Sequence, residues 1–385
     1  MNYDNFIHSP LVDRAEGNTD PDDKTDPIDL NRTDRETDPG DKTGPIDLSR
    51  TTEIRIERET YLDADARGLT LSELLETPEY DPSPAECPLD AFERQLALAG
   101  IRLGGKQATT VDQFYQKAPA LMPEFVMREI KKGQAMRPEL KTLIANSTTV
   151  ANNRYTPFHI DTASGERLSL RPIGEASDIP QILVTEQNHT ITVPEYGLGL
   201  KASYRALRYR TTAQFRVLLW YIGFKLQTDK LAMIVDCLLN GDGNDNPAEV
   251  INADASGTLA YDDLISLWAE FDPFEMNTLV CHVNNLKTIL TMDEFKDPLA
   301  GYRFQSKGKL FSPLGAGLVR CDNVPTDLVI GLDSRFAVEE VITQPLTVEY
   351  DKIIEQRFEE AVISESVAYA RVIREAAVVL DTVYA

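Results

Sequence analysis

One long helix constrains this chain more than any other feature of its sequence. Between residues 211 and 239, apolar residues recur with the three- and four-residue spacing of a buried helical face. They are Phe215, Leu218, Leu219, Ile222, Leu226, Ile234 and Leu238. The sequence Asn240-Gly-Asp-Gly243 then predicts the end of the helix, because glycine is favoured where the backbone leaves a helix. The rest of the chain has to pack around this helix.

Short helices are predicted before it. Thr70-Leu-Ser-Glu73 has a capping residue followed by an acid three positions later. Residues 90–99 predict a helix that Asp90 caps and Gly100 ends. Residues 124–146 predict two helical pieces separated by Gly133.

Residues 147–200 change to the two-residue period of strands, as in Thr190-Ile-Thr-Val193. Turn signals such as Ser164-Gly165 lie between the apolar stretches. The pattern predicts antiparallel hairpins, with one long excursion around residues 155–185.

The C-terminal third predicts more strands and two shorter helices. Residues 318–350 predict strands, with alternation at positions 346, 348 and 350. Residues 351–363 fit a strand or a helix, and Ala376–Leu380 has the composition of a buried strand. Helices are expected over Asp262–Phe271 and Met276–Met292. Taken with the long helix, these elements predict an α+β fold.

The N-terminal segment contains a repeat with a period of 18 residues, because Thr19–Thr33 recurs as Thr37–Thr51. Each copy has two prolines, and its only apolar residues are one Ile and one Leu. Such a segment buries too little surface to offset the entropy of ordering, so we expect an extended or disordered arm. Two interpretations stay open: an arm that docks on a partner through Ile28-Asp-Leu30 and Ile46-Asp-Leu48, or a solvated tail.

The chain of 385 residues has a net charge of −23, of which −13 lies in residues 1–110. This excess of acid argues against a protein that wraps nucleic acid with its whole surface. No apolar run approaches the roughly 20 residues of a membrane span, and Met1–Asp4 lacks the features of a signal peptide. The four cysteines are far apart in the sequence and are expected to be reduced thiols: Cys87, Cys237, Cys281 and Cys321.

Two loops have the spacing of ligand motifs. Gly100–Lys106 fits a phosphate loop, but Gln107 replaces the Ser or Thr that would hold magnesium, and a helix precedes it instead of a strand. Asn252–Asp263 fits a calcium loop, with oxygen-bearing residues at positions 1, 3 and 5 and glycine at position 6. Asp263 is short for the last position, and the preceding helix is missing. The competing interpretation is a turn that caps a helix starting near Tyr261.

No constellation of residues predicts catalysis. The chain has no G-x-S-x-G sequence, and its four histidines stand alone. We therefore predict no catalytic, cofactor-binding or metal-binding residues, no cofactor, and a protein that is not an enzyme. The histidines are His8, His159, His189 and His282.

One stretch opposes the overall charge. Between Glu195 and Asp229 there is no acid, while six bases occur among Tyr and Trp residues. They are Lys201, Arg205, Arg208, Arg210, Arg216 and Lys225. One interpretation is a basic face for polyphosphate or acidic neighbours. The favoured interpretation is pairing with acids of the same fold or of a neighbouring subunit, because the surrounding chain is itself acidic.

Three stretches occur in a fixed order along the chain. The first is Ala120-Leu-Met-Pro-Glu-Phe125, and the second is Tyr196-Gly-Leu-Gly-Leu-Lys-Ala-Ser-Tyr204 with the long helix after it. The third is the run of Pro313-Leu-Gly315, Val319, Val324-Pro325, Gly331-Leu-Asp333 and Phe336. In this order they resemble a tailed-phage major capsid protein of the Hong Kong 97 type, and the resemblance covers about residues 115–385. The ordered set carries the resemblance, since no single motif is specific.

The resemblance implies a Hong Kong 97-like fold with an N-terminal arm, an extended loop hairpin, a peripheral domain with a long spine helix, and an axial domain. The expected boundaries are 1–60 for an acidic N-terminal extension that contains the repeat and 61–118 for an arm with short helices. Residues 119–240 are expected to form part of the peripheral domain, with the extended loop at about 150–190 and the spine helix at about 211–239. The axial domain is expected over 241–340, and residues 341–385 are expected to return to the peripheral domain.

The function implied is that of a structural shell subunit. It would self-assemble through hexamers and pentamers into an icosahedral capsid that encloses phage double-stranded DNA without sequence-specific binding. Portal and scaffolding or decoration proteins would be further partners, with no membrane involved. The protein would be part of the virion capsid after assembly in the host bacterial cytoplasm. Two alternatives stay open: an encapsulin-type nanocompartment shell, and a calcium-binding module built on residues 252–263.

One departure from the family carries a prediction. Some members cross-link their subunits through an isopeptide bond from a lysine on the extended loop, but no lysine occurs here between Lys141 and Lys201. We therefore expect a shell held by non-covalent contacts or accessory proteins. The first 110 residues match nothing in the family. We expect a retained arm, since the repeat lacks the long helices that scaffolding segments use.

Overall fold

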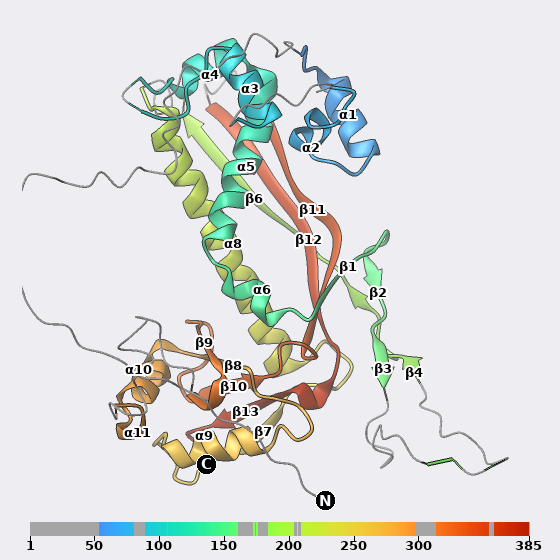
Figure 1. The fold of residues 1–385 in the computed structure, drawn as a ribbon, viewed down its shortest axis with the longest axis vertical. Coiled ribbons are helices and arrows are strands. Elements are labelled where there is room, and N and C mark those ends of the chain that lie inside the picture. The colour runs from blue at the N-terminus through green and yellow to red at the C-terminus, as the bar shows by residue number, and fades with distance from the viewer. Residues whose placement is uncertain are drawn as a thin grey trace, which may run out of the picture. The chain divides into compact units, whose positions relative to one another are not determined.

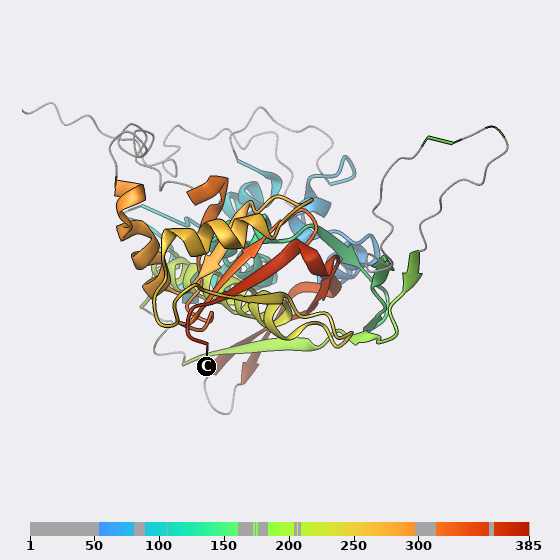
Figure 2. The same cartoon turned by 90° about the horizontal axis from the view of Figure 1, so that it is seen from below.

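The computed structural model describes residues 54–80, 89–105, 107–160, 184–203, 209–296, 313–353 and 358–384, together with residues 172, 173, 175 and 206. All of them belong to one of the two units into which the chain divides, Gly44–Ala385. Helices and mixed sheets make this an α+β fold, as the sequence predicts (Figures 1 and 2). The N-terminal repeat and most of the excursion around residues 155–185 lie outside the described residues.

Short helices form the first part of the described chain. They are α1 (Arg58–Ala66), α2 (Leu71–Leu75), α3 (Ala91–Leu98) and α4 (Val111–Lys117). Both predicted caps are present: the Glu73 N–H donates to Thr70 Oγ1 at 3.2 Å, and the Glu93 N–H donates to Asp90 Oδ1 at 2.7 Å. Gly100 follows α3 with a φ of 65°, a left-handed conformation that glycine adopts without strain.

The long helix α8 packs side by side with α5 (Figure 1). The elements of this region are η1 (Pro119–Leu121), α5 (Met122–Ala135), α6 (Glu139–Leu143) and α8 (Thr212–Asn240). The two helical pieces predicted over residues 124–146 are present as α5 and α6, but Gly133 lies inside α5, so the predicted position of the break is wrong. The reason is tertiary: Gly133 lies where the helices cross, and a Cβ there would stand 2.3 Å from the Trp220 carbonyl oxygen. The glycine allows a close approach and does not end the helix.

A four-stranded sheet lies against these two helices, in the order β1-β11-β12-β6. Its strands are β1 (Asn146–Thr149), β6 (Glu195–Ser203), β11 (Val338–Ile353) and β12 (Phe358–Arg371). β1 runs parallel to β11, and the other pairs are antiparallel. α5 contacts β11 and α8 contacts β12, so both helices cover the same face (Figure 1). The ambiguous segment 351–363 is strand wherever it is described.

Two small antiparallel pairs confirm the predicted hairpin pairing on the described residues at either end of the excursion. β2 (Arg154–Tyr155) pairs with β5 (Ile191–Thr192), and β3 (Phe158–Ile160) pairs with β4 (Val184–Glu186). The base of this hairpin packs on the sheet face opposite the helices. There Ile191 contributes to a small apolar cluster with Ala370, whose neighbour Tyr369 points to the helix side, as alternation along a strand requires.

A second, five-stranded sheet has the order β7-β13-β10-β8-β9. Its strands are β7 (Glu249–Asn252), β8 (Thr278–Cys281), β9 (Gly317–Arg320), β10 (Leu328–Leu332) and β13 (Ala377–Asp381). The accompanying helices are α9 (Tyr261–Ala269), α10 (Val283–Thr291), α11 (Asp293–Lys296), η2 (Pro313–Gly315) and η3 (Arg374–Ala376). The predicted strands at residues 318–350 and 376–380 are confirmed.

The helix expected over Met276–Met292 is only half right. Its first part is β8, every residue of which is buried between β10 and β9. A short apolar run that is buried on both faces has no period that separates strand from helix, which explains the error. The helical part begins only after His282, whose Nδ1 accepts the Asn284 N–H at 3.2 Å.

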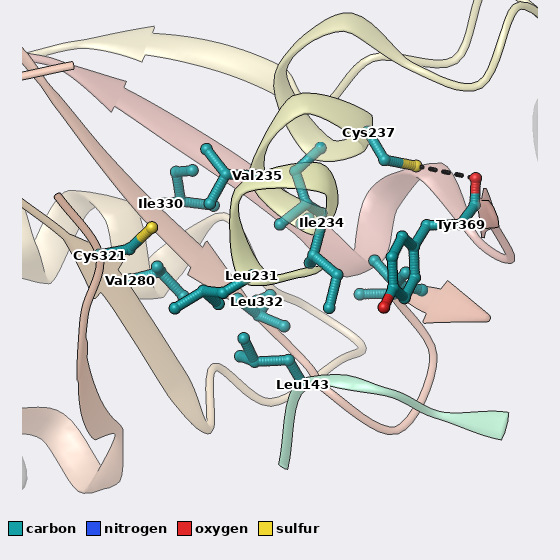
Figure 3. Packing of buried hydrophobic residues seen from close by; sticks show 14 of the residues in the cluster. Leu143, Leu231, Ile234, Val235, Cys237, Val280, Cys321, Ile330, Leu332 and Tyr369 are labelled. Atoms are coloured by element: carbon teal, nitrogen blue, oxygen red, sulfur yellow. Dashed lines mark hydrogen bonds between the residues drawn. The ribbon is translucent and has the colours of Figure 1, made fainter. Parts of the chain in front are cut away.

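Apolar clusters hold these layers together. One joins the C-terminal half of α8 to α6 and to both sheets, through side chains such as Leu143, Ile234 and Ile330 (Figure 3). A second joins the N-terminal helices to α5 and to the first half of α8, and a third fills the space between α9, α10 and the second sheet. None of the described helices is both long and apolar enough to cross a membrane.

The described cysteines are free and buried, as expected of reduced thiols; they are Cys237, Cys281 and Cys321. Burial raises the pKa of the Cys237 thiol to about 12. Its Sγ donates to the Tyr369 carbonyl at 3.5 Å, so it packs as a core residue (Figure 3).

Candidate assembly surface

The turn between β7 and α9 is held closed by hydrogen bonds from its own backbone to the carboxylate of Asp263. Asp263 is 2% exposed, and its two oxygens accept the N–H groups of Asp254 at 2.8 Å and Ala260 at 2.7 Å. The carboxylate that calcium would need is therefore occupied by the backbone. The interpretation as a turn that caps α9 is confirmed. Across the described ranges, no group of three or more His, Cys, Asp or Glu residues is placed to hold a metal ion.

Two bases of the acid-free stretch lie on α8, Arg216 and Lys225, and both pair with acids of the same chain. Arg216 Nε lies 3.0 Å from Glu129 Oε2 on α5, and Lys225 Nζ lies 2.6 Å from Asp229 Oδ1. The favoured interpretation of the stretch between Glu195 and Asp229, pairing within the fold, is confirmed for these two bases. Arg205 and Arg208 lie outside the described residues.

Glu129 fixes the orientation of α8. It is 1% exposed, and Lys132 Nζ at 2.8 Å and Trp220 Nε1 at 2.7 Å donate to it in addition to Arg216. Burial raises the pKa of its carboxyl group, but the hydrogen bonds and charges around it outweigh burial and hold that pKa below its usual value. The ionised carboxylate thus binds α8 to α5 and decides which side of α8 points outward.

The outward side of α8 is apolar. Val217, Leu218, Tyr221 and Phe224 are exposed by 58%, 43%, 64% and 40%, and we call them the outer face of α8. Leu218 was expected on the buried face, but each residue turns a helix by about 100°, which carries it away from its buried neighbour Leu219. A helix that is apolar on opposite sides is normally covered on both.

The strand β6 is a second uncovered feature. Among the described strands it pairs with β12 alone, so it lies at an edge of the described sheet. Tyr196 and Leu198 on this strand are exposed by 42% and 41%. A nine-residue strand at the edge of a sheet, with exposed apolar side chains, favours association with another chain.

The hairpin carries exposed apolar residues as well. Phe158 on β3 is 66% exposed and Val184 on β4 is 55% exposed. At the base of the hairpin, the His189 N–H donates to Asn244 Oδ1 at 2.8 Å, in the turn that follows α8. His189 is exposed and belongs to no cluster of possible metal ligands in the described part of the chain.

Sequence reasoning missed the outer face of α8, although a signal exists. Positions 217, 221 and 224 form a second apolar set with helical spacing, on the side opposite the predicted core face. Which set is buried depends on where Glu129 and the sheet lie, and this is a tertiary fact.

No protein-family model matches the sequence, and no curated protein matches it. Several solved structures are similar. The virus-like particle of Pyrococcus furiosus has 14% identity and a TM-score of 0.46, over 67% of this chain and 97% of that chain. The capsid of an empty GTA particle has 16% identity and a TM-score of 0.48, over 64% and 90%. The SrpI encapsulin of Synechococcus elongatus has 14% identity and a TM-score of 0.44, over 64% and 88%. All three are particle shells.

Proposed function

We propose that this chain is a structural shell subunit that self-assembles into an icosahedral capsid around phage double-stranded DNA. The outer face of α8 carries the proposal. An exposed set of Val, Leu, Tyr and Phe side chains on one side of a helix costs free energy in water, and contact with other copies of the chain recovers it. The order of the sequence features that resemble the Hong Kong 97 type supports the choice of a capsid.

The layout proposed for this subunit follows the sequence boundaries. Residues 119–240 and 341–385 supply the peripheral domain, with α8 as the spine helix, and residues 241–340 supply the axial domain. The exception is β13, which pairs with β7 and β10 and so belongs to the sheet of the axial domain. The hairpin of β2 to β5 is the extended loop. Hexamers and pentamers of the chain build the shell, with portal and scaffolding or decoration proteins as partners. The protein takes its place in the virion capsid after assembly in the host bacterial cytoplasm.

The charge of the chain fits this role. Residues 111–385 carry a net charge of −10, and the described bases of α8 are paired. A shell with a mildly negative subunit encloses DNA without binding it tightly, because strong attraction to phosphates would oppose packaging and release. No catalytic chemistry is part of the proposal.

Electron microscopy of the purified full chain tests the proposal. We expect closed shells from the wild type and none from Tyr221→Asp, because a charge on the outer face of α8 opposes its burial between copies. Leu62→Asp, a change of the same kind at a 57% exposed leucine on α1, is the matched control and should still assemble. Circular dichroism checks that both variants are folded.

A wild type that remains a monomer or dimer under assembly conditions would refute the shell function. If Tyr221→Asp assembled as readily as the wild type, the outer face of α8 would not be an assembly surface. Nuclease-protected DNA in particles purified from infected cells is expected of a phage capsid. Protein cargo in its place would identify a nanocompartment.

A further inference from the structure

A buried lysine lies beside two carboxylates where α8 crosses the four-stranded sheet. Lys230 Nζ contacts Glu365 Oε1 on β12 and lies 3.9 Å from Glu340 Oε1 on β11. The three side chains are exposed by only 11–12%. The contact with Oε1 places the lysine nitrogen next to the carboxyl carbon that bears this oxygen.

The surroundings of this group are apolar along both elements. On α8, Leu226 packs against the apolar cluster that joins α5 to the first half of α8. Ile234 belongs to the apolar cluster around the C-terminal half of α8. On β12, Ile363 and Val367 belong to the same two clusters and flank Glu365 on the same face. Holding an ammonium and two carboxylates in such a place costs free energy that an uncharged group would not.

We propose that Lys230 and Glu365 join in an intramolecular isopeptide bond. An ammonium proton first moves to the carboxylate of Glu365. The lysine nitrogen then attacks Cδ of Glu365 and forms the C–N bond. The carbon–oxygen bond breaks, and the hydroxyl leaves as water with a second proton from the nitrogen. One ammonium and one carboxylate thus give one amide and one water, without an oxidant or a cofactor.

Glu340 is the group that carries the second proton. It lies within reach of the nitrogen and is returned to its original state when the water leaves. Tyr369 OH donates to its Oε1 at 3.3 Å and Ser147 Oγ to its Oε2 at 3.1 Å, so its position is fixed. Because the fold holds the reacting groups in contact, the reaction is intramolecular and needs no encounter between separate molecules. This proximity is what allows the bond to form without a separate enzyme.

A second lysine–carboxylate pair on the same helix provides the matched control. Lys225 and Asp229 are in contact, but their side chains are exposed by 56% and 50%. Water stabilises both of their charges, so this pair remains an ion pair. The difference between the two pairs is burial and the neighbouring Glu340.

Mass spectrometry of the denatured full chain tests the inference. We expect the wild type to be lighter by about 18 Da than its sequence requires, which is the mass of one water. Lys230→Arg should have the mass of its own sequence. A tryptic digest of the wild type should contain one branched peptide that joins the segments around Lys230 and Glu365, and an unmodified Lys225.

Two more variants distinguish a loss of the amide-forming reaction from a loss of the folded structure. Glu365→Gln should form the same amide with loss of ammonia, which is about 17 Da, while Glu340→Gln should leave most chains unlinked. An unmodified wild-type mass, after the folded protein has been kept for days, would overturn the inference. Linkage of Lys225 to Asp229 at the same level would also overturn it, because dehydration would then not depend on the buried site. Neither result bears on shell assembly.

Discussion

At the scale of single residues, Asp333 shows how one buried acid can organise a junction. Its carboxylate accepts the N–H groups of Glu275 and Arg335, at 3.2 Å and 3.1 Å, and Nδ2 of Asn277 at 3.2 Å. The Arg335 guanidinium donates to both of its oxygens, at 2.9 Å and 2.8 Å. This one side chain therefore ties the turn after β10 to the segment before β8.

Asp333→Asn should lower the free energy of unfolding by about 2–3 kcal/mol near neutral pH, because an amide offers fewer acceptors and no charge to Arg335. Burial raises the pKa of Asp333, but Arg335 and the backbone donors outweigh burial and hold it below the usual value. The stabilisation is therefore complete above the pKa of the unfolded chain and is lost as the pH falls through the lower pKa of the folded protein.

Urea unfolding of the wild type and of Asp333→Asn at neutral and acidic pH measures this difference. It should shrink as the solution becomes acidic. A difference that stays constant or grows toward low pH would mean that the carboxylate is not the source of the stabilisation.

At the scale of elements, the crossing of α5 and α8 depends on two glycines. A Cβ on Gly223 would stand 2.1 Å from the Ile130 carbonyl oxygen, and one on Gly133 would collide with the backbone of Trp220. The obstacles are backbone atoms of a packed helix, so they cannot move aside cheaply. This close approach allows Glu129 to reach Arg216, and so it helps to set the outer face of α8.

Gly223→Ala should destabilise the protein by about 3 kcal/mol through overpacking. The sign of this change in stability is informative, because helix propensity alone would make alanine more stable than glycine in a helix by about 1 kcal/mol. Thermal or urea unfolding measures the change. Gly104→Ala is the control, since a Cβ on Gly104 would meet no atom within 4 Å, and its effect should stay within about 0.5 kcal/mol. A neutral or stabilising Gly223→Ala would show that the helices can separate at no cost.

At the scale of the whole molecule, the chain presents several uncovered apolar features, on α8, on β6 and on the hairpin of β3 and β4. The hairpin is the segment that the resemblance would place over a neighbouring subunit. Its stretch between Lys141 and Lys201 contains no lysine, so it offers no amine for a covalent bond to another chain. We therefore expect the subunits to be held together by non-covalent contacts or by accessory proteins.

Particles boiled in detergent should therefore run as single chains on a denaturing gel. A proteomic digest of the same particles should show no peptides joined between residues 142–200 and another chain. A ladder of covalent oligomers that disappears when lysines are replaced would contradict this prediction. Peptides from the first 60 residues should be present, because we expect the N-terminal arm to be retained.

Local signals in the sequence were enough for much of the fold. The period of α8, the caps at Thr70 and Asp90, and the glycine stop after Asn240 depend on side chains within a few residues of the backbone groups that they serve. Such interactions are present in any fold that contains the segment. The sequence thus determined the main helices, most strands and the α+β class, and it showed that the turn near Asp263 is a poor calcium site.

Contacts between distant segments decided the rest. Gly133 serves as a contact point inside a helix, because the backbone of Trp220, far along the chain, packs where a Cβ would be. Residues 278–281 form a strand because β9 and β10 lie on either side of them. The same holds for the outer face of α8 and for Lys230 beside Glu365, since each depends on which elements meet in three dimensions. A residue's own neighbours in sequence set its backbone preference, but burial and charge pairing are properties of the packed molecule, and only the tertiary structure assigns them.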